Sequence, residues 1–155
     1  MQTFMPYSEY HKVAKILDYR RLGKQRIEGL QTYNQLTLGK GGFPHHPINK
    51  MWKYHVESLA EYTNAMITEW INRGYKNTME YIRCCKNFSN YSTEHHIKPD
   101  WVFYWELQRS HQSNLLRKDW EYYRKCFDND IQTDMPYSWP EYSPYTNTWD
   151  YRPNR

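Results

Sequence analysis

The stretch Asp18–Gln35 reads DYRRLGKQRIEGLQTYNQ, and the spacing of its apolar residues predicts a helix from about Asp18 to Leu36. On a helical wheel its polar side chains share one face, because residues three or four apart lie above one another. Arg26 falls on the opposite, apolar side, so we expect it to be buried and paired. The polar face consists of Arg20, Arg21, Lys24, Gln25, Glu28, Gln31, Thr32 and Gln35, and the apolar side of Tyr19, Leu22, Ile27, Leu30 and Tyr33.

Helical patterns recur on both sides of this stretch. Ser8 and Asn49 fit N-caps, since small polar side chains accept hydrogen bonds from the first amides of a helix. Gly74 is expected to end the long helix, Asp119 to cap the last one, and a break is expected near Ser110–Ser113. The predicted helices run from about Glu9 to Leu17, Asn49 to Arg73, Thr78 to Lys86 and, in two parts, Asp100 to Phe127, with loops over Thr37–Pro47 and Asn87–Lys98.

No run of residues alternates with a period of two for long enough to predict a sheet. At 155 residues the chain fits one domain, and its 18% of aromatic residues suggest a core built from rings. Residues 136–155 contain four prolines, which disfavour helix and strand interiors. We therefore predict an all-α fold, a compact single-domain bundle of about four to six helices over residues 1–135. An irregular, aromatic- and Pro-rich tail over residues 136–155 is expected to pack on it, although its rings could also stack on unpaired bases.

Positive charge is concentrated near the N terminus. The formal net charge is +4, but His11–Arg26 holds six Lys and Arg residues against Asp18 alone, a local charge of +5. A basic patch on a nearly neutral body suggests an anionic partner such as nucleic acid, because neutralising phosphates releases counterions. A solvated helix face is the alternative.

The cysteines and histidines argue against several other classes. Three cysteines, Cys84, Cys85 and Cys126, form no C-x-x-C pair, which favours a reduced, intracellular protein. No apolar run approaches the roughly 20 residues of a membrane span. The pairs His45–His46 and His95–His96 lack the spacing of zinc ligands, so neither a metal nor a cofactor is expected. Phosphate-loop and nucleophile-elbow motifs do not occur either.

The polar face of the Asp18–Leu36 helix is the main candidate for chemistry. Glu28 lies four residues after Lys24, and a carboxylate amid cations should be ionised. It could then stabilise a developing positive charge or activate water, while Arg20, Arg21 and Lys24 hold phosphates. A surface ladder of salt bridges would give the same pattern.

Two histidines add to this candidate set. His46 lies in the Gly- and Pro-rich loop, where rigid neighbours can position a binding residue. His111 is flanked by small polar residues, with Arg117 and Lys118 a turn or two further on. Each histidine could donate to a phosphate or act as an acid or base, but each could equally be a capping or core-rim residue.

Several separate motifs spread over most of residues 1–140 form a recognisable set: Met1–Pro6, Leu17–Glu28, His46–Pro47, Met51–Trp52, Trp70, Arg73–Gly74, Ser110–Lys118 and Pro136–Pro140. In their residues and in their order, these motifs resemble those of a bacterial and viral branch of the pyrimidine-dimer DNA glycosylase family.

The resemblance implies a compact helical fold whose N terminus lies near the first long helix. The characterised phage members of this family bend DNA, extrude a base, cleave the glycosidic bond and then the backbone, using the α-amino group as nucleophile and no metal. An Arg and a Glu on that helix assist. In this chain Gln2 is bulky, so we expect Met1 to be retained, and its own amine would have to serve.

Only some residues of the Asp18–Leu36 helix match the functional positions of the family enzymes. Arg20 matches a DNA-contacting Arg and Lys24 a basic contact position, but Arg21 stands where those enzymes have their catalytic Glu. Glu28, two turns along the same face, is the expected substitute, with Asp18 as the second choice.

The sequence therefore predicts a DNA-repair glycosylase that acts, as an intracellular monomer, on damaged or modified pyrimidines in double-stranded DNA. AP-lyase activity is left open. A non-catalytic nucleic-acid-binding module that uses the same helix is the alternative, and an enzyme acting on RNA or free nucleotides is a third. The catalytic candidates are Met1, Glu28 and Arg21, and the DNA-binding candidates are Arg20, Lys24, Gln25, His46, His111, Arg117 and Lys118.

Overall fold

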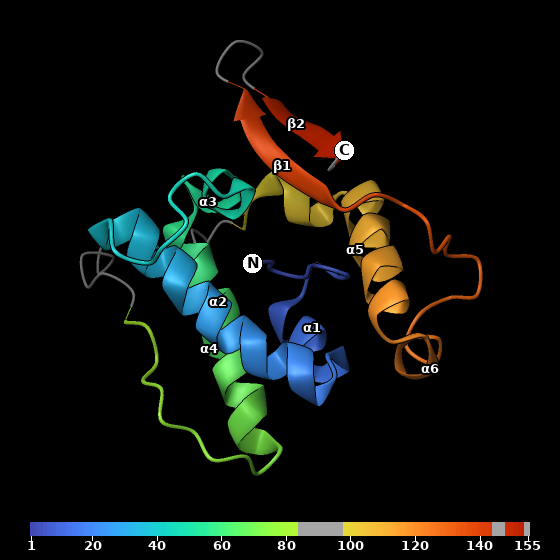
Figure 1. Ribbon diagram of the computed structural model, residues 1–155, viewed down its shortest axis with the longest axis horizontal. Coiled ribbons are helices and arrows are strands. Elements are labelled where there is room, and N and C mark those ends of the chain that lie inside the picture. The colour runs from blue at the N-terminus through green and yellow to red at the C-terminus, as the bar shows by residue number, and fades with distance from the viewer. Residues whose placement is uncertain (84–97, 144–147, 154–155) are drawn as a thin grey trace.

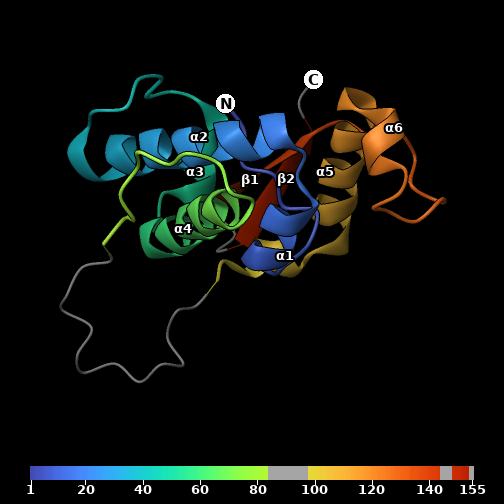
Figure 2. The same cartoon turned by 90° about the horizontal axis from the view of Figure 1, so that it is seen from below.

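Helix α2 (Tyr19–Leu38) runs along one side of the molecule (Figure 1, Figure 2). The computed structural model describes residues 1–83, 98–143 and 148–153. Within them the chain is mostly helical and ends in a two-stranded hairpin, so the predicted helical fold is confirmed. The other elements are α1 (Tyr10–Ile16), α3 (Pro47–Trp52), α4 (Val56–Asn72), the 3-10 helix η3 (Asp100–Phe103), α5 (Trp105–Lys118), α6 (Trp120–Tyr123), β1 (Ser138–Ser143) and β2 (Thr148–Pro153).

Helix α2 begins where the sequence places it. Asp18 is its N-cap, and Asp18 Oδ1 accepts hydrogen bonds from the backbone N–H groups of Arg20 at 2.9 Å and Arg21 at 3.3 Å. The helix ends at Gly39, whose φ of 65° lies in the left-handed region that favours glycine. By contrast, α1 has Glu9 at its N-cap position without a side-chain capping bond, so the predicted Ser8 cap is wrong.

Arg26 is buried on the inner side of α2, as predicted. Its Nη1 donates to Asn77 Oδ1 at 2.9 Å, and its guanidinium carbon lies 4.0 Å from the centroid of the Trp70 ring. The charge is therefore packed on an aromatic face and hydrogen-bonded rather than presented to a ligand.

Other residues of α2 depart from the predicted two faces. Tyr19 and Ile27, expected on the apolar side, are 55% and 47% exposed, whereas Gln25 and Thr32, expected on the polar face, are buried. Two neighbours cause the difference, because α4 packs on one side of the helix and the N-terminal segment packs on another. A wheel drawn from the sequence assumes a single buried face.

The long helix predicted over Asn49–Arg73 is divided into α3 and α4. Pro47 occupies the first turn of α3, and its N-cap is His46, whose Nδ1 accepts from Ile48 N–H at 3.2 Å. Asn49, predicted as the cap, instead donates to the Phe43 carbonyl at 2.8 Å and braces the preceding loop. The predicted end of α4 is confirmed, since Gly74 follows it with a φ of 81°.

Residues Thr78–Arg83 form no helix, contrary to the prediction. Asn64 of α4 binds this segment through both polar atoms: Ile82 N–H donates to its Oδ1 at 2.8 Å, and its Nδ2 donates to the Ile82 carbonyl at 2.9 Å. These bonds use backbone groups that a helix would pair internally. The rest of that predicted helix, Cys84, Cys85, His95, His96 and residues 87–97 of the predicted loop lie outside the described residues.

Helix α5 continues through Ser110–Ser113, where a break was expected. The small polar side chains bind a neighbouring segment rather than their own backbone: Ser110 Oγ donates to the Pro136 carbonyl at 2.7 Å and accepts from Ser138 N–H at 2.8 Å. Asp119 caps α6 as predicted, accepting from Tyr122 N–H at 3.2 Å.

The C-terminal segment contains an antiparallel hairpin, which corrects the prediction of an irregular tail. Strands β1 and β2 pair from Ser138 opposite Pro153 to Ser143 opposite Thr148. Both strands of a two-stranded ribbon are edges, so Pro140 can occupy β1 with its nitrogen turned away from its partner strand. Strand β1 packs on α3, and a 2.9 Å ion pair between Lys50 and Glu141 joins the two elements.

The core is rich in aromatic rings, as the composition predicted. Trp52 lies at its centre, with ring centroids 4.9 Å from Trp101 and 5.9 Å from Tyr62. Helices α2 and α4 cross closely at Gly29 and Thr63. A Cβ added to Gly29 would lie only 3.1 Å from Thr63 Cβ, so glycine is needed at this crossing. The N terminus is surrounded in the view of Figure 1 by α2, α3, α5 and β1, and in the view of Figure 2 it lies at one edge of the molecule beside α2. In the described part of the chain, no helix is long and apolar enough to span a membrane.

Candidate active site and DNA-binding surface

The N-terminal segment runs through the interior, and residues Thr3 to Pro6 are buried. Side chains from four different parts of the fold bind its backbone. The hydroxyl of Tyr62 in α4 lies 3.0 Å from the Phe4 carbonyl and shares its one proton between that oxygen and Gln25 Oε1, and Tyr137 donates to the Thr3 carbonyl at 3.1 Å. Because most backbone polar groups of residues 2–6 are paired with side chains from elsewhere in the chain, the fold positions the N-terminal segment and with it Met1.

Gln25 of α2 is the centre of this network. Its Oε1 accepts from Phe4 N–H at 3.0 Å and from the Tyr62 hydroxyl at 2.6 Å, while its Nε2 donates to the Gln2 carbonyl at 2.9 Å and to Glu28 Oε2 at 3.2 Å. The amide is 1% exposed and its hydrogen-bonding capacity is filled from within the protein. Gln25 was predicted to bind DNA, but its position assigns it to holding the N terminus.

Replacing Gln25 by leucine is expected to lower the free energy of unfolding by roughly 2 to 4 kcal/mol, because the Phe4 N–H and the Gln2 carbonyl lose their partners in the interior. Urea denaturation followed by circular dichroism measures this change. Gln31→Leu, at an exposed position of the same helix, is the matched control and should change stability by less than about 0.5 kcal/mol. Equal stability of the two variants would contradict the assignment.

His111, predicted to line the site, lies in the core instead. Its Nδ1 accepts from Met5 N–H at 2.7 Å, so the proton of the neutral ring is on Nε2, which lies 3.1 Å from the Ser138 carbonyl. Tyr137 stacks on the ring at a centroid distance of 4.2 Å. Burial lowers the pKa of His111 from 6.5 to about 4, despite the hydrogen bond to Ser138. A fully buried neutral imidazole cannot contact a phosphate, and the prediction is corrected.

This burial predicts a pH dependence of stability. Since the pKa of His111 is lowered in the folded state, the neutral side chain stabilises the fold above pH 6.5. This stabilisation is lost as the pH falls toward about 4. The loss amounts to about 3 kcal/mol, because one pKa unit corresponds to about 1.4 kcal/mol. His111→Asn should be less stable than the wild type at neutral pH, and this difference should shrink on acidification. Urea unfolding at several pH values tests this, and a constant difference would count against a neutral buried His111.

A cavity of about 490 Å³ opens beside the N terminus. It brings together eight of the ten predicted site residues, including Met1, Glu28 and His46, whereas His111 and Arg117 do not line it. Arg117 is exposed and donates to the Thr133 carbonyl at 2.6 Å. The cavity is lined by Met1, Gln2, Phe4, Arg20, Arg21, Lys24, Gln25, Glu28, His46, Lys118 and Trp139.

Sequence reasoning from charge and wheel position did not single out Gln2, Phe4 or Trp139. Trp139 reaches the cavity from β1, more than a hundred residues along the chain from α2. The one signal that could have found it is the motif Pro136–Pro140, which lies within the family resemblance.

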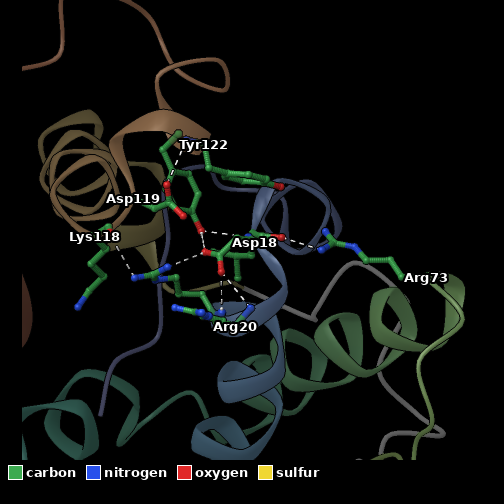
Figure 3. A network of polar contacts seen from close by, with 9 residues as sticks. Asp18, Arg20, Arg73, Lys118, Asp119 and Tyr122 are labelled. Atoms are coloured by element: carbon green, nitrogen blue, oxygen red, sulfur yellow. Dashed lines mark hydrogen bonds and ion pairs between the residues drawn. The ribbon is translucent and has the colours of Figure 1, made fainter.

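Arg21 is held at the cavity by two anchors. Its Nη1 pairs with Asp18 Oδ2 at 3.2 Å, and its Nη2 donates to the Lys118 carbonyl at 3.3 Å at the end of α5. Tyr123 of α6 donates to Asp18 Oδ2 at 2.5 Å, so a network centred on Asp18 joins α2 to α5 and α6 (Figure 3). Burial opposes ionisation of Asp18, but the hydrogen bonds from Tyr123 and Arg21 and the Arg21 charge lower its pKa below the ordinary value.

Arg20 and Lys24, unlike Arg21, have side chains that are not bound to neighbouring groups among the described residues. Neither side chain makes a hydrogen bond or an ion pair with any other described residue, and both are exposed at the cavity. Lys118 completes the group, and its pKa is lowered by burial and then by the charges of Arg21 and Lys24. Several cations with few internal partners are available there for an anionic ligand.

His46 and the N-terminal amine lie close to one another in the cavity. Burial and then the charge of the Met1 amine lower the pKa of His46. Since Nδ1 of His46 accepts the capping hydrogen bond from Ile48, the neutral ring carries its proton on Nε2. His46 is therefore a neutral hydrogen-bond donor rather than a cation at neutral pH.

Glu28 is hydrogen-bonded both to the second residue of the chain and to Gln25. Its Oε2 accepts from Gln2 N–H at 3.1 Å, one peptide away from the Met1 amine. The cavity thus combines an α-amine, a carboxylate and unpaired cations. Among the described residues, no group of three or more His, Cys, Asp or Glu side chains gathers as metal ligands would.

Comparison with known proteins identifies the group to which the chain belongs. A search of curated proteins and a search of solved structures each found no match. A sequence model described as pyrimidine dimer DNA glycosylase matches residues 1–83, more than half of the chain. That range includes the N-terminal segment, α2 and every cavity residue except Lys118 and Trp139. The chain belongs to the pyrimidine dimer DNA glycosylase family.

Proposed function

We propose that this protein is a DNA-repair glycosylase that removes damaged pyrimidines from duplex DNA and then cleaves the abasic product through the Met1 amine. Family membership supports the glycosylase activity. The observation that carries the lyase step is the position of Met1, which lines a basic cavity one peptide away from a carboxylate. The remaining residues of the N-terminal segment hold that position through the Gln25 network.

The proposed reaction begins with attack of the neutral Met1 amine on C1′ of the damaged nucleotide. The glycosidic bond breaks, and the base departs from C1′ with the bonding electron pair and takes up a proton, while a base in a cyclobutane dimer stays joined to its partner pyrimidine. Opening of the sugar ring transfers a proton to O4′ and leaves an iminium bond between C1′ and the Met1 nitrogen. Loss of a proton from C2′ then expels the 3′ phosphate, and water hydrolyses the imine to free the amine.

Glu28 has two roles in this scheme. Its carboxylate stabilises the positive charge that develops on the sugar and on the iminium nitrogen, and it passes the proton between the amine and O4′. His46, a neutral donor beside the amine, binds an oxygen of the substrate through Nε2–H. Arg21, anchored by Asp18 and the Lys118 carbonyl, supplies a fixed positive charge at the edge of the cavity.

Arg20 and Lys24 are proposed to bind the phosphates that flank the lesion. Arg20→Ala is expected to weaken binding of every duplex alike and to reduce the slope of log affinity against log salt by about 1, because one phosphate contact is lost. Fluorescence anisotropy over a salt series measures both quantities. Lys15→Ala removes the same charge from an exposed position outside the cavity and should leave the slope unchanged. Equal effects of the two variants would point to a diffuse charge contribution.

Borohydride trapping tests the proposed function. The protein is incubated with duplexes that carry a thymine dimer, an abasic site, a modified pyrimidine or no lesion, each with and without borohydride. Reduction of the iminium should leave a covalent protein–DNA adduct with the dimer and abasic duplexes and none with the intact duplex. Cleavage of the glycosidic bond over several turnovers without an adduct, detected as alkali-labile sites in the lesion strand, would leave a glycosylase that lacks the lyase step. Absence of both base release and adduct would overturn the proposal.

A further inference from the structure

Trp139 differs from the core residues Trp52 and Trp70 in the hydrogen bonding of its indole N–H. It lines the cavity and is 7% exposed, with its ring centroid 5.2 Å from His46 in an edge-to-face arrangement and 4.6 Å from Tyr137. Trp52 Nε1 donates to Thr3 Oγ1 at 2.9 Å, and Trp70 Nε1 donates to a backbone carbonyl at 3.0 Å. Trp139 Nε1 is buried and has no partner among the described residues, although buried donors are paired in nearly all proteins.

The position of Trp139 is fixed from both ends of its segment. On one side of it, Ser138 donates its N–H to Ser110 Oγ at 2.8 Å. On the other, Glu141 forms its 2.9 Å ion pair with Lys50 of α3. The backbone that carries the indole is thus fixed beside the cavity, which favours a role in contacting a ligand over a role in closing the site.

The charged residues that line the cavity suit the sugar and phosphates of a nucleotide rather than its base. Arg20, Lys24 and Lys118 provide positive charge, and Met1 and Glu28 provide the groups that react. A nucleobase needs a flat apolar surface and a few hydrogen-bonding groups. In this cavity the indole of Trp139 offers both, because its ring is aromatic and its N–H is a donor without an acceptor.

We propose that Trp139 recognises the base that is rotated out of the duplex at the lesion. The base packs against the indole ring, and a base carbonyl oxygen accepts a hydrogen bond from Trp139 Nε1 after a small turn of the ring exposes it. This inference rests on the proposed function, in which a base must leave the stack. It also assigns base selection to the C-terminal hairpin, outside residues 1–83 that the family model covers.

The test compares two duplexes that differ only in the presence of bases. One carries a thymine dimer; in the other, tetrahydrofuran residues, which have no base, replace the dimer and the nucleotides opposite it. Binding of wild type, Trp139→Phe, Trp139→Ala and Trp105→Phe is measured by fluorescence anisotropy. Trp105 is 62% exposed and does not line the cavity, so Trp105→Phe is the matched control. Melting curves establish that each variant is folded.

Trp139→Ala should weaken binding of the dimer duplex by roughly 10- to 100-fold, the range for loss of one base–aromatic contact. Trp139→Phe, which keeps a ring and loses the donor, should weaken it by about 3- to 10-fold. Binding of the base-free duplex should change by less than about twofold in both, and Trp105→Phe should behave as wild type. If Trp139→Phe is folded and weakens both duplexes equally, or neither, the inference is overturned.

Borohydride trapping of wild type on abasic DNA separates the two proposals. Trapping, together with identical effects of the Trp139 variants on both duplexes, would retain the lyase and reject base recognition by Trp139. Failure to trap, together with a dimer-specific loss of binding in those variants, would reject the lyase and retain base recognition.

Discussion

Glu28→Gln is expected to lower the rate of base release and adduct formation by about 10²- to 10⁴-fold, the range for loss of a group that transfers protons in the transition state. The amide keeps the shape of the side chain and can still accept from Gln2 N–H, so the N terminus should stay in place. DNA affinity should be unchanged or higher, because the variant removes one negative charge from a basic cavity. Single-turnover cleavage of the glycosidic bond measures the reaction rate, and fluorescence anisotropy measures the DNA affinity, on the same duplex.

Glu121→Gln is the matched control for this variant. Glu121 is 76% exposed and pairs with Arg124 on α6, so its replacement makes the same change in net charge away from the cavity. It should alter the rate by less than about twofold. If Glu28→Gln releases base as fast as wild type, Glu28 takes no part in catalysis. Loss of binding and rate together would instead assign Glu28 to DNA binding.

Extending the N terminus is expected to abolish the lyase step. Two residues, Gly-Ser, placed before Met1 would move the α-amine by up to about 7 Å along the chain. The residues that follow cannot shift to compensate, because Gln25, Tyr62, Tyr137 and His111 bind their backbone. Loss of a positioned nucleophile should lower the rate of borohydride-trapped adduct formation on abasic DNA by more than roughly a thousandfold. This factor is equivalent to about 4 kcal/mol of transition-state stabilisation.

The same two residues attached after Arg155 are the control and should leave trapping unchanged. Circular dichroism and DNA affinity show whether the extended protein is folded and still binds. Undiminished trapping by the N-terminally extended protein would mean that another amine is the nucleophile. Lys24 and Lys118 line the same cavity, so Lys24→Ala and Lys118→Ala in the extended protein would then identify it.

The family resemblance implies that Arg21 stands at the position of a catalytic glutamate, and the contacts of Arg21 in the cavity are consistent with the loss of a carboxylate there. Arg21 is committed to Asp18 and to the Lys118 carbonyl, and it offers no carboxylate to the site. Asp18, the second carboxylate considered, is occupied by Tyr123, by Arg21 and by the first amides of α2. Glu28 is bound at the second residue of the chain, which supports its role as the acidic partner of the amine.

Local chemistry accounts for the parts of the fold that could be predicted from sequence. The start of α2 near Asp18, the stop at Gly74 and the cap at Asp119 each depend on one residue acting on a few neighbours. The burial of Arg26 followed from helical periodicity alone. The split of the helix predicted over Asn49–Arg73 could not be predicted this way, because both parts have the composition of a helix.

The sequence by itself determined that the chain is helical, that cations and Glu28 share one face of α2, and that its motifs are those of a DNA glycosylase family. These features depend on residue type and on spacing within a few helical turns, so a short stretch of sequence is enough to predict them. Only the tertiary structure decided which polar residues are exposed. Gln25 and His111 are buried because the N-terminal segment lies across them, and Trp139 reaches the cavity because a distant hairpin packs on α3. Burial depends on what packs from elsewhere in the chain, which the spacing of residues within one helix does not encode.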